Sequence, residues 1–200
     1  ILRVDHTDIL ECRNCKENNK LITNFNISVA ITDDFMENLE AGKSYDLMDP
    51  HTNKSVQKIS AKEVFDLIVK QAHKNGEPGV IFIDRINQYN PTPKLGKIES
   101  TNPCGEQPLL PYESCDLGSI NLDRMCKKKN AGYDVDWDKL REVTLLAVYF
   151  LDNLIDVNKF PLPQIEKATK LTRKIGLGVM GWASLLIRLG IPYNSDEAVR

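Results

Sequence analysis

Long apolar runs are missing from this sequence of 200 residues, and so is an excess of charge of either sign. No apolar stretch approaches the roughly 18 residues that a membrane-spanning helix needs, and no signal peptide is visible. The net charge is -2, from 26 basic and 28 acidic residues, so the sequence lacks the basic signature of a nucleic-acid-binding protein. We therefore expect a soluble globular chain whose partners include neither nucleic acid nor a membrane.

Cysteine is also scarce. Five cysteines, an odd number with one irregular pair, do not form a disulfide framework, which favours a reducing cytoplasm. Cys12 and Cys15 form a lone C-x-x-C motif. A zinc site would need two more ligands, and a thioredoxin-like motif would follow a strand rather than a charged helix end. We interpret the pair as helix-end residues without a shared function, and Cys126 has no visible role.

Strand patterns alternate with helix patterns along the chain, which predicts an α/β fold. Residues 24–31 alternate apolar and polar side chains, as in a half-buried strand. Capping residues bound the expected helices. We expect helices within residues 5–16, 32–42, 60–75, 136–160, 163–172 and 182–189, strands at 24–31, 79–83 and 117–122, a loop at 87–97 and a solvated turn at 127–132. The apolar residues of the longest helix, including Trp137 and Val148, are expected to pack in the core.

Reactive side chains are most concentrated in residues 101–115, TNPCGEQPLLPYESC. Pro103 has a fixed φ and disfavours a helical conformation of Asn102, so we expect residues 102–106 to run extended within a stiff loop. Alternate side chains of an extended chain share a face. The sequence therefore predicts that Asn102, Cys104 and Glu106 project into one space.

A thiol between a carboxamide and a carboxylate supports few chemistries. The thiol can be a nucleophile, a metal ligand, a redox partner or a radical carrier, the carboxylate can take a proton, and the carboxamide can orient a hydroxyl. A protease-type nucleophile needs an imidazole base, and none of the three histidines lies near the stretch in sequence. The plain alternative, that Cys104 is a small buried hydrophobe, is disfavoured by its polar neighbours.

Residues 102–106, NPCGE, and 111–122, PYESCDLGSINL, resemble the finger loop of ribonucleotide reductases, closest to the adenosylcobalamin-dependent class II enzymes. The resemblance continues in residues 24–29 and 32–36 and in residues 175–183 and 189–193, and so covers nearly the whole chain. It implies part of the ten-stranded α/β barrel of that family, in which two five-stranded halves surround the finger loop.

The resemblance also implies the extent of the domain. We expect residues 1–200 to be a single partial catalytic barrel domain, truncated at both ends, because the sequence lacks a first methionine and stops soon after a helix-start signal at residues 194–197. A partial barrel leaves sheet edges open, which disfavours independent stability.

The implied reaction is reduction of a ribonucleotide at its 2′ carbon by radical chemistry, for DNA synthesis and repair. By resemblance, Cys104 carries the thiyl radical that takes the 3′ hydrogen of the substrate, Glu106 is the base on the 3′ hydroxyl, and Asn102 orients the substrate hydroxyls. Cys115 matches one of two cysteines that deliver the electrons and end as a disulfide, with its partner expected upstream of Ile1.

The resemblance implies adenosylcobalamin as the radical source, a ribonucleotide as substrate and a thioredoxin-like protein as reductant. In the full-length protein it adds an allosteric nucleoside triphosphate and a homodimer as a candidate assembly, and it implies no metal site. The substrate-phosphate and allosteric loops and the C-terminal cysteines of the family have no counterpart here, so the isolated chain is expected to be inactive.

Other functions stay open at this point. A class I reductase would use a separate metal-containing radical subunit, and a non-enzymatic cysteine-bearing module would bind a ligand such as zinc. Residues 176–181 also match the dinucleotide motif G-x-G-x-x-G, with Asp196 placed 20 residues after Gly176. Against a dinucleotide site, residues 171–175 are too polar for a buried central strand, and no second strand precedes Asp196.

Overall fold

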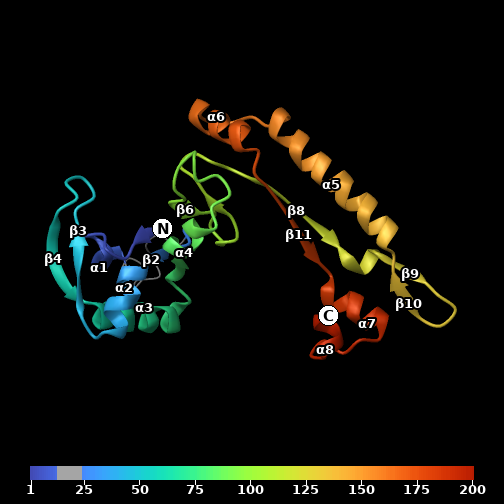
Figure 1. Ribbon diagram of the computed structural model, residues 1–200, viewed down its shortest axis with the longest axis horizontal. Helices are drawn as coiled ribbons and strands as arrows, with labels where there is room; N and C mark the ends of the chain where they lie inside the picture. Colours follow the sequence, from blue (N-terminus) through green and yellow to red (C-terminus); the bar gives the residue numbers. More distant parts are fainter. Residues whose placement is uncertain (13–23) are drawn as a thin grey trace. The chain divides into compact units, whose positions relative to one another are not determined.

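The computed structural model describes residues 1–12 and 24–200, which form a mixed α/β structure, as predicted (Figure 1). The chain divides into two compact units, the N-terminal unit Ile1–Pro111 and the C-terminal unit Tyr112–Arg200. The strands of the described residues form one three-stranded sheet and four two-stranded sheets, so these residues show no closed barrel.

The N-terminal unit is built on a parallel sheet in the order β1 (Leu2–Arg3), β2 (Ser28–Ile31) and β5 (Gly79–Phe82). Residues 29–31 of the middle strand are all buried. A strand is thus present as predicted, but only over Ser28–Ile31, and the prediction that it is half-buried is wrong, because a central parallel strand is covered on both faces.

Helices α2 (Asp33–Glu40) and α3 (Ala61–Asn75) have the ends that their capping residues predict. The Oγ1 of Thr32 accepts a hydrogen bond from the backbone N–H of Phe35 at 3.2 Å, and Ser60 caps α3 in the same way. Gly76 closes α3 with a φ of 83°. The other elements of the unit are α1 (Ile9–Cys12), α2 (Asp33–Glu40), β3 (Ser44–Met48), β4 (Ser55–Ser60), α3 (Ala61–Asn75), α4 (Ile83–Gln88), β6 (Ser100–Thr101) and β7 (Pro108–Leu109).

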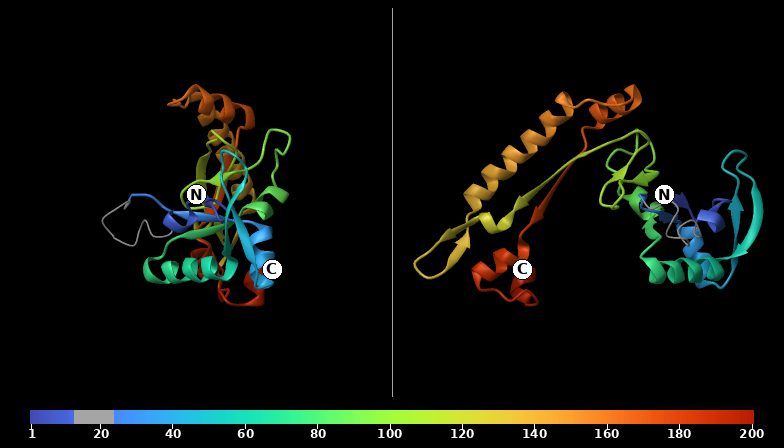
Figure 2. Two further views of the ribbon diagram at one scale, coloured as in Figure 1. Left: turned by 90° about the vertical axis from the view of Figure 1, so that its left-hand side faces the viewer. Right: turned by 180° about the vertical axis from the view of Figure 1, so that it is seen from behind.

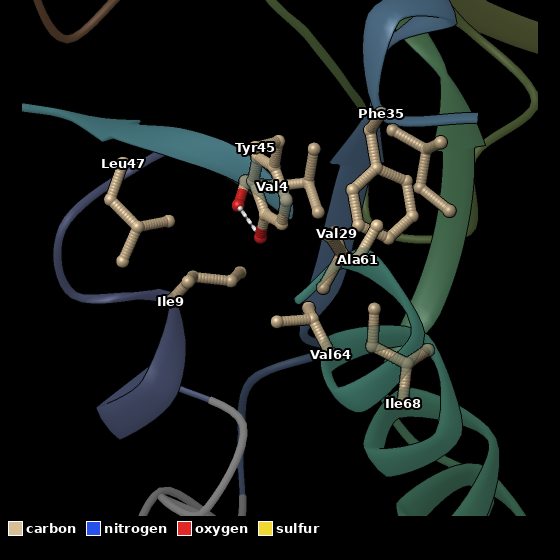
Figure 3. Close-up of a cluster of buried hydrophobic side chains, with 10 residues drawn as sticks. Val4, Ile9, Val29, Phe35, Tyr45, Leu47, Ala61, Val64 and Ile68 are labelled. Carbon is tan, nitrogen blue, oxygen red and sulfur yellow. Dashed lines mark hydrogen bonds between the residues drawn. The ribbon is translucent and has the colours of Figure 1, made fainter. Parts of the chain in front are cut away.

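The core of this unit lies between the sheet, α3 and the β3–β4 hairpin (Figure 3). It consists of Val4, Ile9, Val29, Ile31, Phe35, Tyr45, Leu47, Ala61, Val64 and Ile68. The rings of Phe35 and Tyr45 meet edge to face, with their centroids 5.0 Å apart. The buried hydroxyl of Tyr45 donates a hydrogen bond to the carbonyl of Val4 at 2.9 Å. Burial raises the pKa of Tyr45.

The C-terminal unit contains two parallel strands, β8 (Asp116–Asn121) and β11 (Ile175–Met180), with α5 (Trp137–Val157) running along them (Figure 2). The predicted helices α6 (Pro163–Thr172) and α7 (Trp182–Leu189) are confirmed. The remaining elements are a 3-10 helix (Leu122–Arg124), the hairpin strands β9 (Cys126–Lys128) and β10 (Tyr133–Val135), and α8 (Asp196–Val199).

Only part of α5 packs as predicted. Leu151 and Ile155 are buried, with 3% and 0% of their surface exposed, but Trp137 is 68% exposed and Val148 is 41% exposed. The prediction that these two residues belong to the core is therefore wrong within the described residues.

The glycines of the G-x-G-x-x-G match lie in and just after a strand. Gly176 and Gly178 belong to β11, and Gly181 precedes α7 with a φ of +73°. A dinucleotide site needs these glycines in the loop between a strand and a helix, where their backbone cradles phosphate. The structure therefore argues against the dinucleotide alternative.

Replacing Tyr45 by phenylalanine should lower the free energy of unfolding by about 1–2 kcal/mol, because the buried Val4 carbonyl loses its hydrogen bond. Denaturant unfolding of the two proteins would measure this. The control is Tyr89→Phe, because Tyr89 is 84% exposed. The raised pKa of Tyr45 means that the hydroxyl stabilises the fold below about pH 10, the ordinary tyrosine pKa, and this contribution is lost as the pH rises further. Equal losses for both variants would contradict the packing described.

Replacing Gly181 by alanine should destabilise the C-terminal unit more than the same change at Gly190. Both glycines have a φ of +73°, so both variants carry a left-handed strain of about 1–2 kcal/mol. A Cβ at Gly181 would also collide with Oδ1 of Asn121, whereas a Cβ at Gly190 would meet no atom within 4 Å. We expect a total loss of about 3 kcal/mol at Gly181. Denaturant midpoints of the two variants measure the difference, and an equal shift would exclude the collision.

Candidate active site

Residues 102–107 form a tight turn between β6 and β7. The backbone N–H of Gly105 donates to the carbonyl of Asn102 at 3.1 Å, and the N–H of Asn102 donates to the carbonyl of Gln107 at 3.1 Å. The prediction that residues 102–106 run extended is therefore wrong. Asparagine, proline and glycine at the first, second and fourth positions favour a β-turn, and Gly105 adopts a φ of +88°.

The turn brings the carboxamide of Asn102 to the carboxylate of Glu106. The Nδ2 of Asn102 donates to Oε1 of Glu106 at 2.5 Å, and its Oδ1 accepts from the N–H of Gln107 at 3.0 Å. The turn also contacts the segment before β2, because Nδ2 of Asn26 donates to the carbonyl of Pro103 at 3.4 Å. The predicted convergence is thus present for two of the three residues, through a turn rather than an extended chain.

The third residue, Cys104, lies on the turn between these two. Its side chain is exposed and forms no disulfide, so the alternative of a small buried hydrophobe is wrong for this chain. A cavity of about 1080 Å³ lies elsewhere in the same unit, where Arg3, His6 and Asp84 are among its lining residues, and none of the three predicted site residues lines it. A single cavity shared by Asn102, Cys104 and Glu106 stays a prediction.

The side chain of Asn87 in α4 holds the segment that leads into the hairpin formed by β6 and β7. Its Oδ1 accepts from the N–H of Ile98 at 2.8 Å, and its Nδ2 donates to the carbonyls of Ile98 at 2.8 Å and of Ile83 at 3.0 Å. Ile98 is buried and packs with Ala30 and Ile83, and Leu110 packs against the same cluster. The sequence did not predict this role of Asn87, because the residue was interpreted only as the start of a loop.

Two further thiols, those of Cys115 and Cys126, lie in the C-terminal unit. Cys115 is half-buried and directly precedes β8. Cys126 begins β9 and packs at the edge of the apolar cluster formed by Ile120, Leu122, Met125 and Leu185. Burial raises the pKa of the Cys126 thiol. These contacts give Cys126 a packing role.

Within residues 1–12 and 24–200, no group of three or more His, Cys, Asp or Glu side chains is placed to hold a metal ion. In the same part of the chain, no helix combines the length and the apolar character needed to cross a membrane. The C-x-x-C prediction is not addressed, because Cys15 lies outside the described residues and only the backbone of Cys12 is described.

Comparison with known proteins connects this chain to one family. The family model for the ribonucleotide reductase barrel domain matches residues 1–200. The chain is 54% identical over its whole length to a vitamin B12-dependent ribonucleoside-diphosphate reductase of Thermoplasma acidophilum and covers 26% of that protein. It is 52% identical to the Mycobacterium tuberculosis protein of the same name, of which it covers 28%. The chain is 30% identical to a vitamin B12-dependent ribonucleotide reductase of Streptomyces clavuligerus. This match includes 86% of the chain and 18% of that relative.

Replacing Asn87 by alanine should loosen the segment around Ile98, which leads into the β6–β7 hairpin. The buried N–H of Ile98 would lose its acceptor at a cost of about 1–3 kcal/mol, so its hydrogen exchange should accelerate by roughly ten- to a hundredfold. Residue-resolved hydrogen exchange measures this. The control is Asn38→Ala, because the side chain of Asn38 makes its hydrogen bond in an exposed setting and within its own helix, to the carbonyl of Asp34. Unchanged exchange at Ile98 would show that Asn87 does not hold the hairpin.

Proposed function

The chain belongs to the ribonucleotide reductase family, as part of its barrel domain, and from this premise we propose that the full-length protein reduces ribonucleotides to 2′-deoxyribonucleotides by thiyl-radical chemistry, for DNA synthesis and repair. The names of the relatives at 54% and 52% identity support adenosylcobalamin as the cofactor and a ribonucleoside diphosphate as the substrate. The chain spans about a quarter of those relatives. The observation that carries the proposal is the turn that presents an exposed thiol between a bonded carboxamide and carboxylate.

Cys104 fits the chemistry of the cofactor because it is an exposed thiol outside any disulfide. When bound, adenosylcobalamin supplies a carbon-centred radical that can take a hydrogen atom from a thiol. A class I enzyme would depend on a separate radical subunit instead, and the vitamin B12-dependent relatives favour the class II assignment.

The roles of the turn residues follow from their chemistry. The thiyl radical of Cys104 takes the 3′ hydrogen of the ribose, and the carboxylate of Glu106 takes the proton of the 3′ hydroxyl. The Nδ2 of Asn102 has two N–H bonds, of which one holds Glu106, so the second can donate to a substrate hydroxyl.

The electrons come from a pair of thiols, and Cys115 is one of them. The 2′ hydroxyl of the ribose leaves as water, the two thiols supply two electrons and two hydrogens and close to a disulfide, and the 3′ carbon regains its hydrogen from Cys104. An external dithiol, of the thioredoxin type, then reduces the disulfide. The second thiol belongs to the full-length protein, outside this chain.

The parallel strand pairs β1-β2-β5 and β8-β11 support a place in a ten-stranded α/β barrel, with residues 102–107 as its central finger loop. For the full-length protein we also propose an allosteric nucleoside triphosphate, a homodimer and a cytoplasmic location. The 200 residues form one partial barrel domain and are expected to be inactive when isolated.

Variants of the full-length enzyme separate the roles of the two thiols. Cys104→Ser should abolish turnover, because a serine O–H is much stronger than an S–H, and Glu106→Gln should lower kcat by about a hundredfold or more, because it removes the base. Cys115→Ser should keep the first radical step and block the redox cycle. The measurements are exchange of the cofactor 5′ hydrogens with solvent and formation of deoxynucleotide.

The assignment fails if the Cys115 variant loses hydrogen exchange as completely as the Cys104 variant. It also fails if the Cys104 variant continues to form deoxynucleotide. Tyr89→Phe is a suitable control, because Tyr89 is 84% exposed and is not one of the proposed site residues.

A further inference from the structure

One ion pair of the C-terminal unit is largely shielded from water. The Nζ of Lys174 lies 2.6 Å from Oε2 of Glu113, and the two side chains are 15% and 0% exposed. In the nearby pair of Lys170 and Glu166, by contrast, the side chains are 42% and 50% exposed. Burying two charges carries a desolvation penalty that only a well-ordered geometry offsets. The buried pair therefore restricts the position of the chain on both sides of the contact.

Cys115 and the ion pair lie at the same end of two paired strands. Asp116, the first residue of β8, pairs with Ile175, the first residue of the parallel strand β11. Cys115 and Lys174 each directly precede these first paired residues, and the two strands lie side by side (Figure 1). Neighbouring strands are about 4.8 Å apart. Glu113, the partner of Lys174, lies two residues before Cys115.

The residue between Glu113 and Cys115 is also fixed. The Oγ of Ser114 lies 2.7 Å from Oγ1 of Thr169, and the N–H of Ser114 donates to the same oxygen at 3.3 Å. Thr169 belongs to α6 and is 1% exposed. Two consecutive residues ahead of Cys115 are thus bonded to α6 and to the residue before β11.

Arg173 directs Lys174 toward Glu113. It ends α6 in the left-handed conformation, with a φ of 47°, and its backbone N–H donates to the carbonyl of Thr169 at 2.8 Å. Its guanidinium binds Asp152 at 2.8 Å and Asp156 at 2.9 Å, both in α5. A left-handed conformation is costly for a residue with a side chain. These bonds to two carboxylates hold it in place.

We propose that Glu113 and Lys174 are positioning residues for Cys115. The inference rests on the proposed function, in which Cys115 closes a disulfide during turnover and is reduced again by an external dithiol. Disulfide closure requires Cβ atoms about 3.5–4.5 Å apart and a defined torsion. The buried ion pair holds the backbone of Cys115 so that its sulfur can meet this geometry in each cycle.

The first test measures the accessibility of Cys115 in the reduced full-length protein. A neutral maleimide labels the thiols, and mass spectrometry resolves the rate at each site. In Glu113→Gln and in Lys174→Met, labelling of Cys115 should accelerate by about tenfold, the effect of losing a charge-assisted contact. Labelling of Cys126, a half-buried thiol of the same unit, should stay within about twofold of the wild type, because the change is local.

Two further variants control for charge and for general loosening. Lys174→Arg retains the positive charge and should keep Cys115 close to its wild-type rate. Lys170→Met removes an exposed lysine of α6 and should change neither thiol. The double variant Glu113→Gln, Lys174→Met leaves no unpaired buried charge, so the protein should still fold. Labelling of Cys115 should still be faster than in the wild type.

The second test follows the reaction. Enzyme reduced beforehand and given substrate without reductant should form about tenfold less deoxynucleotide in the Lys174→Met variant, while exchange of the cofactor 5′ hydrogens, which depends on Cys104, stays at the wild-type rate. A parallel rise in labelling of Cys126, unchanged labelling of Cys115, or equal loss in Lys174→Arg and Lys174→Met would overturn the inference. A wild-type protein that forms no deoxynucleotide would overturn the proposed function instead, and the labelling rates would still decide the positioning role.

Discussion

The candidate site depends on one carboxamide. The side chain of Asn102 accepts from the N–H of Gln107 and donates to Glu106, so it closes the turn and orients the carboxylate at the same time. A hydrogen bond to a carboxylate is stronger than a neutral one. Because Cys104 lies between the two bonded residues, the same contact determines which groups flank the thiol. Because Asn102 shapes the turn and is also proposed to contact the substrate, it would link the fold of the loop to its chemistry.

The parallel sheet of the N-terminal unit determines where residues 102–107 lie within that unit. The buried strand β2 packs through Ala30 against Ile83 and Ile98, and Asn87 bonds both backbone groups of Ile98. The hairpin therefore begins from a buried and hydrogen-bonded base. In the C-terminal unit, the buried pair of Glu113 and Lys174 has the corresponding effect on Cys115. Each thiol proposed for the reaction thus follows a segment that is fixed by buried polar contacts.

Local signals in the sequence predicted the elements that local chemistry determines. Side-chain caps gave the ends of α2 and α3, and Gly190 gave the end of α7. Helix α4 was not predicted, because Phe82 at its N-terminus provides no side-chain cap. The β3–β4 hairpin escaped because β4 is largely exposed and lacks an apolar alternation.

The geometry of the turn and of the contacts around it differs from the prediction. Pro103 alone favours an extended chain, whereas the four residues Asn-Pro-Cys-Gly together are typical of a β-turn. The contact of Glu113 with Lys174 spans 61 residues and leaves no local signal. The sequence also did not predict that Trp137 is exposed. A helical period shows which residues share a face of the helix, but not whether another element covers that face.

The central claim is that Asn102, Cys104 and Glu106 surround the ribose of the substrate. A crystal structure of the full-length protein with a bound ribonucleoside diphosphate tests this most directly. The account predicts that the ribose hydroxyls contact Asn102 and Glu106, with the 3′ carbon facing the sulfur of Cys104. A ribose bound away from the turn, or a Cys104 sulfur directed away from the sugar, would contradict it.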